Sequence, residues 1–269
     1  MIIGNKTFDT EKTGYIMGIL NVTPDSFSDG GSYDKLDAAL YQAEKMIKEG
    51  AAIIDIGGES TRPNYTMISD QEEIERVTPV IEAVKSRFDT VISLDTYKSQ
   101  VAKAGIEAGA DLINDIWGLK WDGTMADVIA KGDVAACLMH NRKEMDYTNY
   151  IEDVMADLKE TMDMAKKAGI KKDKIMLDPG IGFAKTLEQN RLLMKHLSRL
   201  NEFDVPVLLG TSRKSMIGLT LDLPVDQREE GTMATTVMGY MAGCRFFRVH
   251  NVEANYRAMK MTEAICNEQ

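Results

Sequence analysis

The chain has 269 residues, 44% of them hydrophobic and 28% charged, and this composition excludes a disordered or collagen-like protein. Its 42 acidic side chains outnumber the 32 basic ones and give a net charge of -10, which argues against general binding to nucleic acid or to anionic membranes. No apolar run approaches the ~20 residues that cross a bilayer, and the first residues lack the pattern of a secretory signal, so we expect a cytoplasmic protein.

Eight short apolar runs follow one another along the chain, a pattern typical of buried parallel strands. The runs cover residues 15–20, 52–56, 91–95, 111–115, 134–139, 174–178, 205–210 and 244–249. Ahead of the first run, we expect residues 1 to about 14 to form a small polar cap on the floor of the fold.

Segments with helical periodicity separate these runs, and several of them end in glycine, as a helix often does. They cover residues 32–50, 69–87, 97–109, 125–132, 150–169, 187–200 and 229–243. Because the strands and helices alternate at the spacing of a β/α unit, the sequence predicts an α/β fold, a (β/α)8 TIM barrel that forms a single domain over residues 1–269. An open eight-stranded sheet is the alternative. A dinucleotide site is not expected, because no G-x-G-x-x-G motif follows the first strand.

Catalytic groups of such a barrel lie at the carboxyl ends of the strands and in the loops that follow. The expected strand ends are polar here, although the strand interiors are apolar. They are Asn21, Asp55, Asp95, Asn114, Asp115, His140, Asn141, Asp178, residues 211–215, Arg248 and His250. Any one of them could instead cap a helix or shape a turn, so only groups of them indicate a site.

Three of these strand ends, Asp95, Asn114 and Asp178, are hydrogen-bond acceptors that we expect to converge at the mouth of the barrel. Buried acceptors need donors, so the group predicts a ligand with several N–H groups. A flat heterocycle with an amino-substituted amidine edge has such donors.

Basic residues follow the seventh and eighth strands, where barrels of this kind often bind phosphate. Lys214, Arg248 and His250 could hold a doubly charged anion there. The alternatives are a solvated pair for Lys214 and Arg213, and a salt bridge to a neighbouring Asp for Arg248.

Two loops, 21–32 and 57–69, are longer than most strand-to-helix connections and carry Phe27 and Arg62. Loops of this length over a barrel mouth usually bind or cover substrate. Mobility without function is the alternative.

The motifs GILNVTPDSFSDGG at 18–31 and GAAIIDIGGESTRP at 50–63 resemble the two signature segments of the dihydropteroate synthase family. The resemblance extends over nearly the whole chain. It continues through SLDTYK (93–98), LINDIWG (112–118), LMHNR (138–142), LDPGIGF (177–183), GTSRKS (210–215) and FRVHNV (247–252).

The resemblance implies the bacterial single-domain form of a TIM-barrel transferase of folate biosynthesis. Its substrates would be (7,8-dihydropterin-6-yl)methyl diphosphate and p-aminobenzoate, its cofactor Mg2+, and its usual state a homodimer. By resemblance, Asp95, Asn114 and Asp178 would bind the pterin ring. Lys214 would lie near the pterin carbonyl and p-aminobenzoate. Asp95 and Lys214 would be the catalytic residues, without a covalent nucleophile.

The same resemblance assigns the other two subsites. Asn21 would bind the diphosphate together with Thr61, Arg248 and His250, and it would also reach the magnesium ion. The p-aminobenzoate pocket would be formed by Phe27, Thr61, Arg62, Pro63, Phe183 and Ser215.

Two other functions are compatible with a pterin-binding barrel. A methyltetrahydrofolate-type methyltransferase would not need the anion site at Arg248 and His250 or the loop at 60–63, so these segments favour the synthase. A non-catalytic pterin-binding homologue should show decay in the loops or in the anion site, and both are intact in the sequence.

Overall fold

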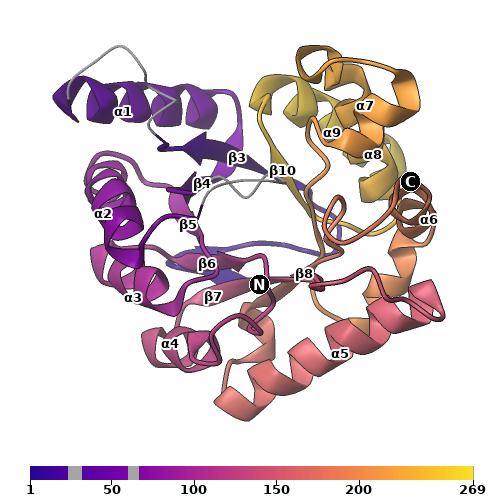
Figure 1. The fold of residues 1–269 in the computed structure, drawn as a ribbon. Helices are drawn as coiled ribbons and strands as arrows, with labels where there is room; N and C mark the ends of the chain where they lie inside the picture. Colours follow the sequence, from indigo (N-terminus) through magenta and orange to yellow (C-terminus); the bar gives the residue numbers. More distant parts are fainter. Residues whose placement is uncertain (24–31, 60–66, 269) are drawn as a thin grey trace.

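Eight parallel strands form a nearly closed barrel at the centre of the molecule (Figure 1). The computed structural model describes residues 1–23, 32–59 and 67–268. The strand order is β8-β7-β6-β5-β4-β3-β10-β9, and a single bridge between Leu177 and Val207 joins the two edges. The strands are β3 (Tyr15–Asn21), β4 (Ala51–Gly57), β5 (Val91–Asp95), β6 (Leu112–Asp115), β7 (Ala135–Met139), β8 (Ile175–Asp178), β9 (Leu208–Leu209) and β10 (Phe246–Val249). Each lies within one residue of a predicted run or inside it, so the single-domain TIM barrel is confirmed.

Helices surround this barrel (Figure 1). They are α1 (Ser32–Lys48), α2 (Asp70–Arg87), α3 (Ser99–Ala108), α4 (Met125–Gly132), α5 (Tyr150–Ala168), α6 (Leu187–Lys195), α7 (Ser215–Leu221), α8 (Glu229–Met241) and α9 (Val252–Asn267). Short 3-10 helices occupy Lys172–Lys174, Leu197–Phe203 and Val225–Gln227. The expected helix over 187–200 is therefore divided near His196, and α7 and α9 were not predicted. No helix in the described part of the chain combines the length and the apolarity needed to span a membrane.

Alternate residues of each strand face opposite sides of the barrel wall, as the two-residue period of a strand requires. The outward side chains, among them Ile54, Ile92 and Ile113, pack against the helices in one large apolar cluster. The inward side chains form a second cluster at the lower level of the barrel. Its strand residues include Met17, Ile53, Val91, Leu112, Cys137, Met176, Leu208 and Phe246.

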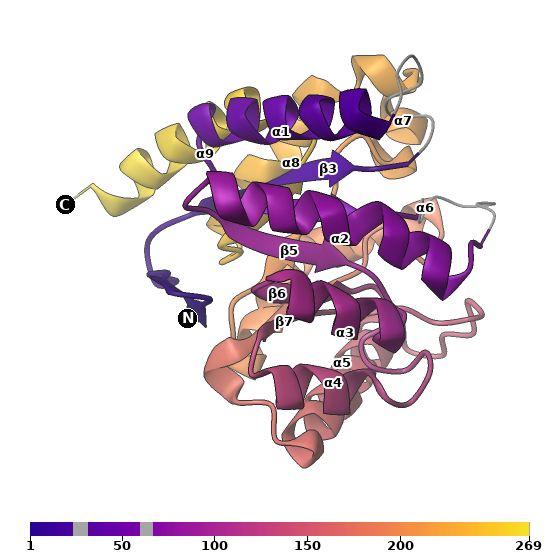
Figure 2. The ribbon, with the colours of Figure 1, turned by 90° about the vertical axis from the view of Figure 1, so that its left-hand side faces the viewer.

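An N-terminal hairpin covers the floor of the barrel. Its strands β1 (Ile2–Ile3) and β2 (Lys6–Thr7) pair antiparallel, and they lie at the end opposite to the one toward which the arrows of β3 and β5 point (Figure 2). The expected cap is present, but its inner face is apolar rather than polar. Ile3 and Phe8 are buried in the inner cluster, and the Phe8 ring lies 4.8 Å from that of Tyr15.

Candidate active site

On six of the eight strands, the inward face loses its apolar character toward the barrel mouth. Two residues after the inner-cluster position, and therefore on the same face, these strands carry a polar side chain or glycine, whereas β3 and β7 carry Ile19 and Met139. The six residues are Asp55, Ser93, Asn114, Asp178, Gly210 and Arg248, with Asp95 one step higher on β5. Parallel strands thus bring together groups from across the whole sequence.

Arg248 is the centre of the charged cluster. Its Nε donates to Asp55 Oδ2 at 2.6 Å, and its Nη2 donates to Asp95 Oδ2 at 2.7 Å. Asp55 is fully buried and also accepts from Ser93 Oγ at 2.5 Å and from Asn114 Nδ2 at 3.4 Å. Burial opposes the charge of Arg248, but the two aspartates outweigh it and raise the pKa of the guanidinium.

One carboxylate oxygen of Asp95 is available to a ligand. Its Oδ1 is buried and has no hydrogen-bond partner among the described residues. Burial raises the pKa of Asp95 to about 7, although Arg248 opposes the shift. A buried, unpaired carboxylate oxygen is costly, so this atom indicates a ligand that donates a hydrogen bond to it.

Asp178 and Lys214 face the same space from β8 and from the loop after β9. A Cβ built on Gly210 would lie 3.5 Å from Asp178 Oδ2 and 3.8 Å from Lys214 Nζ. Burial raises the pKa of Asp178, and the positive charge of Lys214 opposes that rise. Burial likewise lowers the pKa of Lys214 to about 8, and Asp178 opposes this shift. The pair is therefore an acceptor and a cation that are both partly removed from water.

Lys214 is oriented by the loop that follows β8. Its Nζ donates to the Ile181 carbonyl at 2.6 Å and lies 4.9 Å from the centre of the Phe183 ring. Asp178 is held from the same loop, because Gly180 N donates to Asp178 Oδ1 at 2.6 Å. The second oxygen of Asp178 and the ring of Phe183 thus border the mouth beside the Lys214 amine.

His250 and Asn21 lie on the flanks of the cluster. His250 Nδ1 is 2.9 Å from Ser212 Oγ, which also accepts from the His250 backbone N–H. A Cβ built on Gly57 would lie 3.7 Å from both Asn21 Oδ1 and Asp95 Oδ2. Asn21 and Asp95 are therefore on either side of Gly57, which has no side chain to fill the space between them.

Together these groups can bind a flat, N–H-rich ring against buried acceptors and an anion beside a cation. A family model described as a pterin binding enzyme matches residues 17–250. The dihydropteroate synthase of Clostridium beijerinckii is 58% identical to this chain over 266 residues, which cover 98% of the chain and 99% of that protein. The chain belongs to the dihydropteroate synthase family.

Solved structures of the dihydropteroate synthase family agree with this assignment. The enzyme of Clostridium difficile, crystallised in the presence of pteroic acid, has 48% identity and a TM-score of 0.95, with 97% of this chain and 100% of that chain covered. The Xanthomonas albilineans enzyme with 4-aminobenzoic acid has 39% identity and a TM-score of 0.91, covering 96% and 94%. The activity of this chain is that of the family, the transfer of a pterin-methyl group to an arylamine.

The predicted site residues fall into three groups. Asp95, Asn114, Asp178, Lys214 and Arg248 meet at the mouth, with Phe183, His250 and Asn21 around them. Ser215 is the exposed first residue of α7, next to Lys214 in the chain. Phe27, Thr61, Arg62 and Pro63 lie outside the described residues.

Arg248 makes the salt bridge to a neighbouring Asp that the sequence left open as an alternative. It pairs with two of them, Asp55 and Asp95. Its Nη1 has no acceptor among the described residues and could still donate to a ligand. Asp115, by contrast, turns back and accepts from Trp117 N and Leu119 N, so this strand-end carboxylate shapes its own loop.

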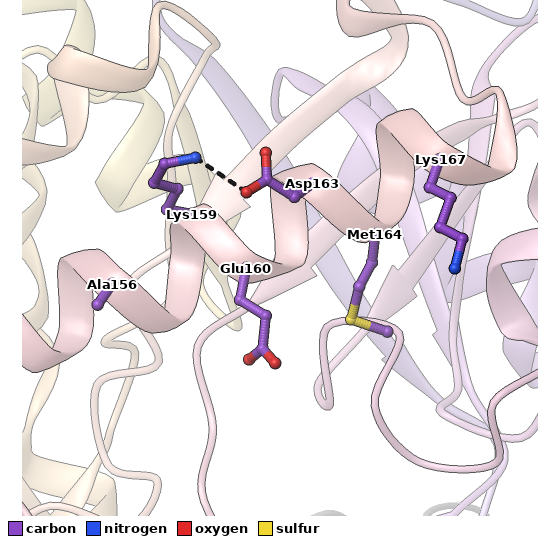
Figure 3. A pocket seen from close by; sticks show the side chains of 6 residues that line it. All are labelled: Ala156, Lys159, Glu160, Asp163, Met164 and Lys167. Carbon is purple, nitrogen blue, oxygen red and sulfur yellow. Dashed lines mark hydrogen bonds and ion pairs between the residues drawn. The ribbon is translucent and has the colours of Figure 1, made fainter.

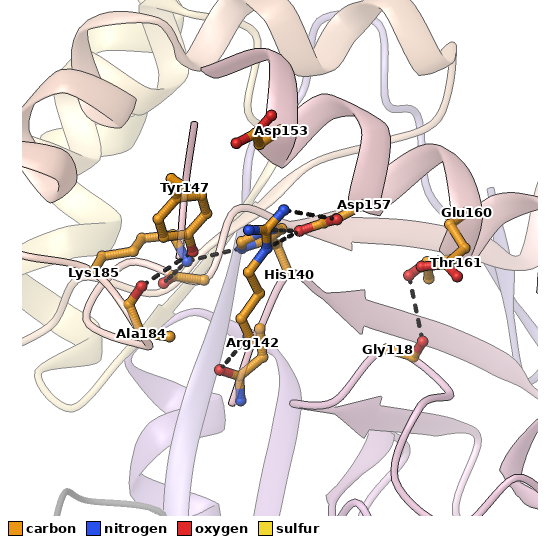
Figure 4. A network of polar contacts seen from close by, with 12 residues as sticks. Gly118, His140, Arg142, Tyr147, Asp153, Asp157, Glu160, Thr161, Ala184 and Lys185 are labelled. Carbon is orange, nitrogen blue, oxygen red and sulfur yellow. Dashed lines mark hydrogen bonds and ion pairs between the residues drawn. The ribbon is translucent and has the colours of Figure 1, made fainter. Parts of the chain in front are cut away.

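The sequence missed a buried polar network beside the mouth (Figure 4). His140 at the end of β7 joins Lys185 and Asp157, and Asp157 also accepts from Arg142. The LMHNR motif contained two of these residues, but nothing in the local sequence marks Lys185 as buried, since it precedes a helix like many exposed lysines.

A shallow hollow on the outer face of α5 lies apart from the mouth (Figure 3). The residues that line it come from this helix alone, and Lys159 is paired there with Asp163. They are Ala156, Lys159, Glu160, Asp163, Met164 and Lys167. A surface of one helix without convergent groups is a solvated face and not a ligand site.

Proposed function

We propose that the chain joins (7,8-dihydropterin-6-yl)methyl diphosphate to p-aminobenzoate at the barrel mouth, with residues 1–269 acting as one pterin-binding unit. The observation that carries this proposal is the unpaired, buried Oδ1 of Asp95 beside Asn114 and Asp178. The 2-amino group and ring N–H groups of a pterin would supply the donor that Asp95 Oδ1 lacks and could also donate to Asn114 and Asp178. The relatives crystallised in the presence of pteroic acid and with 4-aminobenzoic acid support the same ligands here.

The leaving diphosphate would meet Arg248, His250 and Asn21. Arg248 would donate a hydrogen bond from its Nη1. Its guanidinium is held in position by the ion pairs with Asp55 and Asp95. The described residues contain no group of three or more acidic, His or Cys side chains that could bind a metal by themselves. Mg2+ often takes only one or two protein oxygens and completes its shell with phosphate oxygens and water, so it would not need such a group. Asn21 Oδ1 would be the protein oxygen, and the ion would neutralise charge on the diphosphate.

The chemistry follows from the charges at the mouth. When the bond between the pterin methylene and the diphosphate oxygen breaks, its electron pair leaves with the diphosphate, and the carbon becomes cationic. The buried carboxylates of Asp95 and Asp178 stabilise that cation as it spreads into the ring. The amine of p-aminobenzoate then bonds to the carbon and loses a proton, so no covalent nucleophile is needed.

The p-aminobenzoate would lie next to the Lys214 amine and the Phe183 ring, which are stacked 4.9 Å apart. Ser215, at the start of α7, would reach its carboxylate. Phe27, Thr61, Arg62 and Pro63 are assigned to this subsite, and Thr61 also to the diphosphate, on their motifs alone.

The direct test is an assay of the purified protein with dihydropterin diphosphate, p-aminobenzoate and Mg2+. Dihydropteroate and pyrophosphate should form in equal amounts. A folded protein that binds pteroic acid but forms neither product would be the non-catalytic homologue instead. Omission of Mg2+ with excess chelator should abolish turnover and leave pteroic acid binding intact.

We also propose a homodimer, which uses the outer face of α8 and α9. These helices pack side by side and expose Met238, Met241, Met261 and Ile265, each more than half accessible. Apolar side chains gathered on adjacent helices are typical of protein interfaces. Light scattering should give twice the chain mass, and Met241→Lys with Met261→Lys should give the monomer. A cytoplasmic location without nucleic-acid or membrane partners stays a prediction, which fractionation of the source cells would test.

A further inference from the structure

Lys185 is buried although it belongs to no substrate subsite named above. It precedes α6 and is 9% exposed. Its Nζ lies 2.9 Å from three acceptors, the Gly180 carbonyl, the Phe183 carbonyl and His140 Nδ1. Three acceptors around one nitrogen match the three donors of an ammonium group.

The rest of the network fixes the direction of these bonds (Figure 4). His140 Nε2 lies 3.0 Å from Asp157 Oδ2, which also accepts from Arg142 Nε at 2.6 Å. Because the carboxylate favours a proton on Nε2, it leaves Nδ1 as the acceptor for Lys185. Burial lowers the pKa of His140 to about 4, so the ring is neutral at physiological pH and keeps this polarity.

The loop at 179–183 passes very close to the network. Gly180 has φ +70°, and a Cβ there would lie 2.0 Å from the His140 carbonyl oxygen, so only glycine fits. Tyr147 Oη donates to the Ala184 carbonyl at 3.0 Å and fixes the end of the loop. On its other side, this loop holds Asp178 through Gly180 N, and Lys214 through the Ile181 carbonyl.

We propose that Lys185 is a positioning residue that fixes the 179–183 loop from its buried side and, through this loop, the carboxylate of Asp178. Without the ammonium, two loop carbonyls lose their donor, and the loop can rotate away from the mouth. Both Asp178 Oδ1 and the acceptor of Lys214 would then move. The inference rests on the proposed function, because the loop matters only where Asp178 and Lys214 bind the pterin.

The test compares pteroic acid binding by calorimetry in the unchanged protein, in Lys185→Met and in Lys120→Met. Lys120 is the matched control, because its Nζ donates to the Asp157 backbone carbonyl and to Glu160 without touching the loop. The titrations are run near pH 6, because burial lowers the pKa of Lys185 to about 7, with Asp178 opposing, and the ammonium is then present. They are also run well below the thermal midpoint of each protein, so that lost stability does not appear as lost affinity.

We expect Lys185→Met to weaken pteroic acid binding about tenfold or more, and Lys120→Met to leave it unchanged. In turnover assays, KM for the dihydropterin diphosphate should rise by a similar factor, with a smaller effect on kcat. Equal affinity in Lys185→Met would overturn the positioning role. Failure of the unchanged protein to bind pteroic acid would overturn the proposed function instead.

A second variant covers the case in which Lys185→Met does not fold. Tyr147→Phe removes only the hydroxyl that anchors the same loop at Ala184, and it keeps the ring that stacks on Arg142. Pteroic acid binding should weaken about threefold, in proportion to one lost neutral hydrogen bond. Unchanged affinity in this folded variant would contradict the proposal.

Discussion

The two oxygens of Asp95 face different partners. Oδ2 accepts from Arg248, whereas Oδ1 has no partner among the described residues. Burial raises the pKa of this carboxyl to about 7, so it is partly protonated near neutral pH. Arg248 thus stabilises Oδ2 of Asp95, whereas Oδ1 remains available to a ligand.

This arrangement predicts that pteroic acid binding releases protons near pH 7. Ring N–H groups that donate to Oδ1 favour the ionised carboxylate, so they lower its pKa, and the proton leaves for solvent. Calorimetric titrations in buffers of different ionisation enthalpy measure this release. It should fall toward zero above about pH 9, where the carboxyl is already ionised. Net proton uptake at pH 7 would contradict the assigned direction.

Asp178→Asn should keep the fold and lose pteroic acid affinity by about 2–4 kcal/mol. The amide offers one acceptor where the carboxylate offers two, and its NH2 group opposes the donors of the ring. The control is Asp115→Asn, a strand-end carboxylate that serves its own loop. Urea unfolding should show lower stability for the control, while calorimetry shows unchanged affinity. Equal affinities for both variants would place the ring elsewhere.

Arg248 and His250 should differ when each is replaced by alanine. His250 is proposed to bind the diphosphate and contacts Ser212 rather than the buried carboxylates, so His250→Ala should raise KM for the diphosphate substrate at least tenfold and leave pteroic acid binding nearly unchanged. Arg248→Ala leaves Asp55 and Asp95 buried without their cation, a loss of about 3–5 kcal/mol, so both ligands and stability should suffer. A competition assay with both ligands measures the split. Identical profiles would show that the anion and pterin subsites are not separable.

At the scale of elements, the eight strands were predictable because each is an apolar run that is buried on both faces. The inward polar positions at their ends were also predictable, since a period of two fixes which residues share a face. The pairing of Arg248 with Asp55 was not, because it depends on how their side chains reach past β3, the strand that lies between β10 and β4. α7 has only seven residues with an internal glycine, and α9 exposes Met261 and Ile265, so neither gives a clear apolar stripe.

The N-terminal hairpin should stabilise the barrel without affecting the mouth. Phe8→Ala removes a ring that packs against Tyr15 and Phe246, and it should lower the free energy of unfolding by about 3–5 kcal/mol. Ile2, in β1, is 47% exposed, so Ile2→Ala should cost less than ~1 kcal/mol. Urea titrations give both values. Pteroic acid affinity should be the same in both variants, and a parallel loss of affinity would contradict the separation of floor and mouth.

At the scale of the whole molecule, the groups proposed to bind the anion and the buried carboxylates lie on different strands, and the proposed function has them act on one bond. If Arg248 and His250 stabilise the diphosphate while Asp95 and Asp178 stabilise the cation, the bond to carbon should break before the amine attacks. Positional isotope exchange tests this order. With the bridging oxygen labelled and p-aminobenzoate omitted or replaced by an unreactive analogue, the label should scramble into non-bridging positions. Turnover without scrambling would favour concerted displacement.

The same order predicts the binding sequence of p-aminobenzoate. Bound pyrophosphate would remain as counter-ion to the cation, so p-aminobenzoate should bind well only after pterin and pyrophosphate. Tight p-aminobenzoate binding to the ligand-free protein would contradict it.

The hairpin at the floor also determines the route by which ligands enter and leave the barrel. Ile3 and Phe8 close the lower end of the barrel, so molecules enter and leave by the mouth alone. The pterin, against the strand ends, would occupy the inner subsite, and p-aminobenzoate would occupy the outer one. Because the site has one opening, binding and release are then ordered, and the first ligand to bind is the last to be released. High p-aminobenzoate should therefore slow the escape of bound pterin, even though the two molecules never compete for one place.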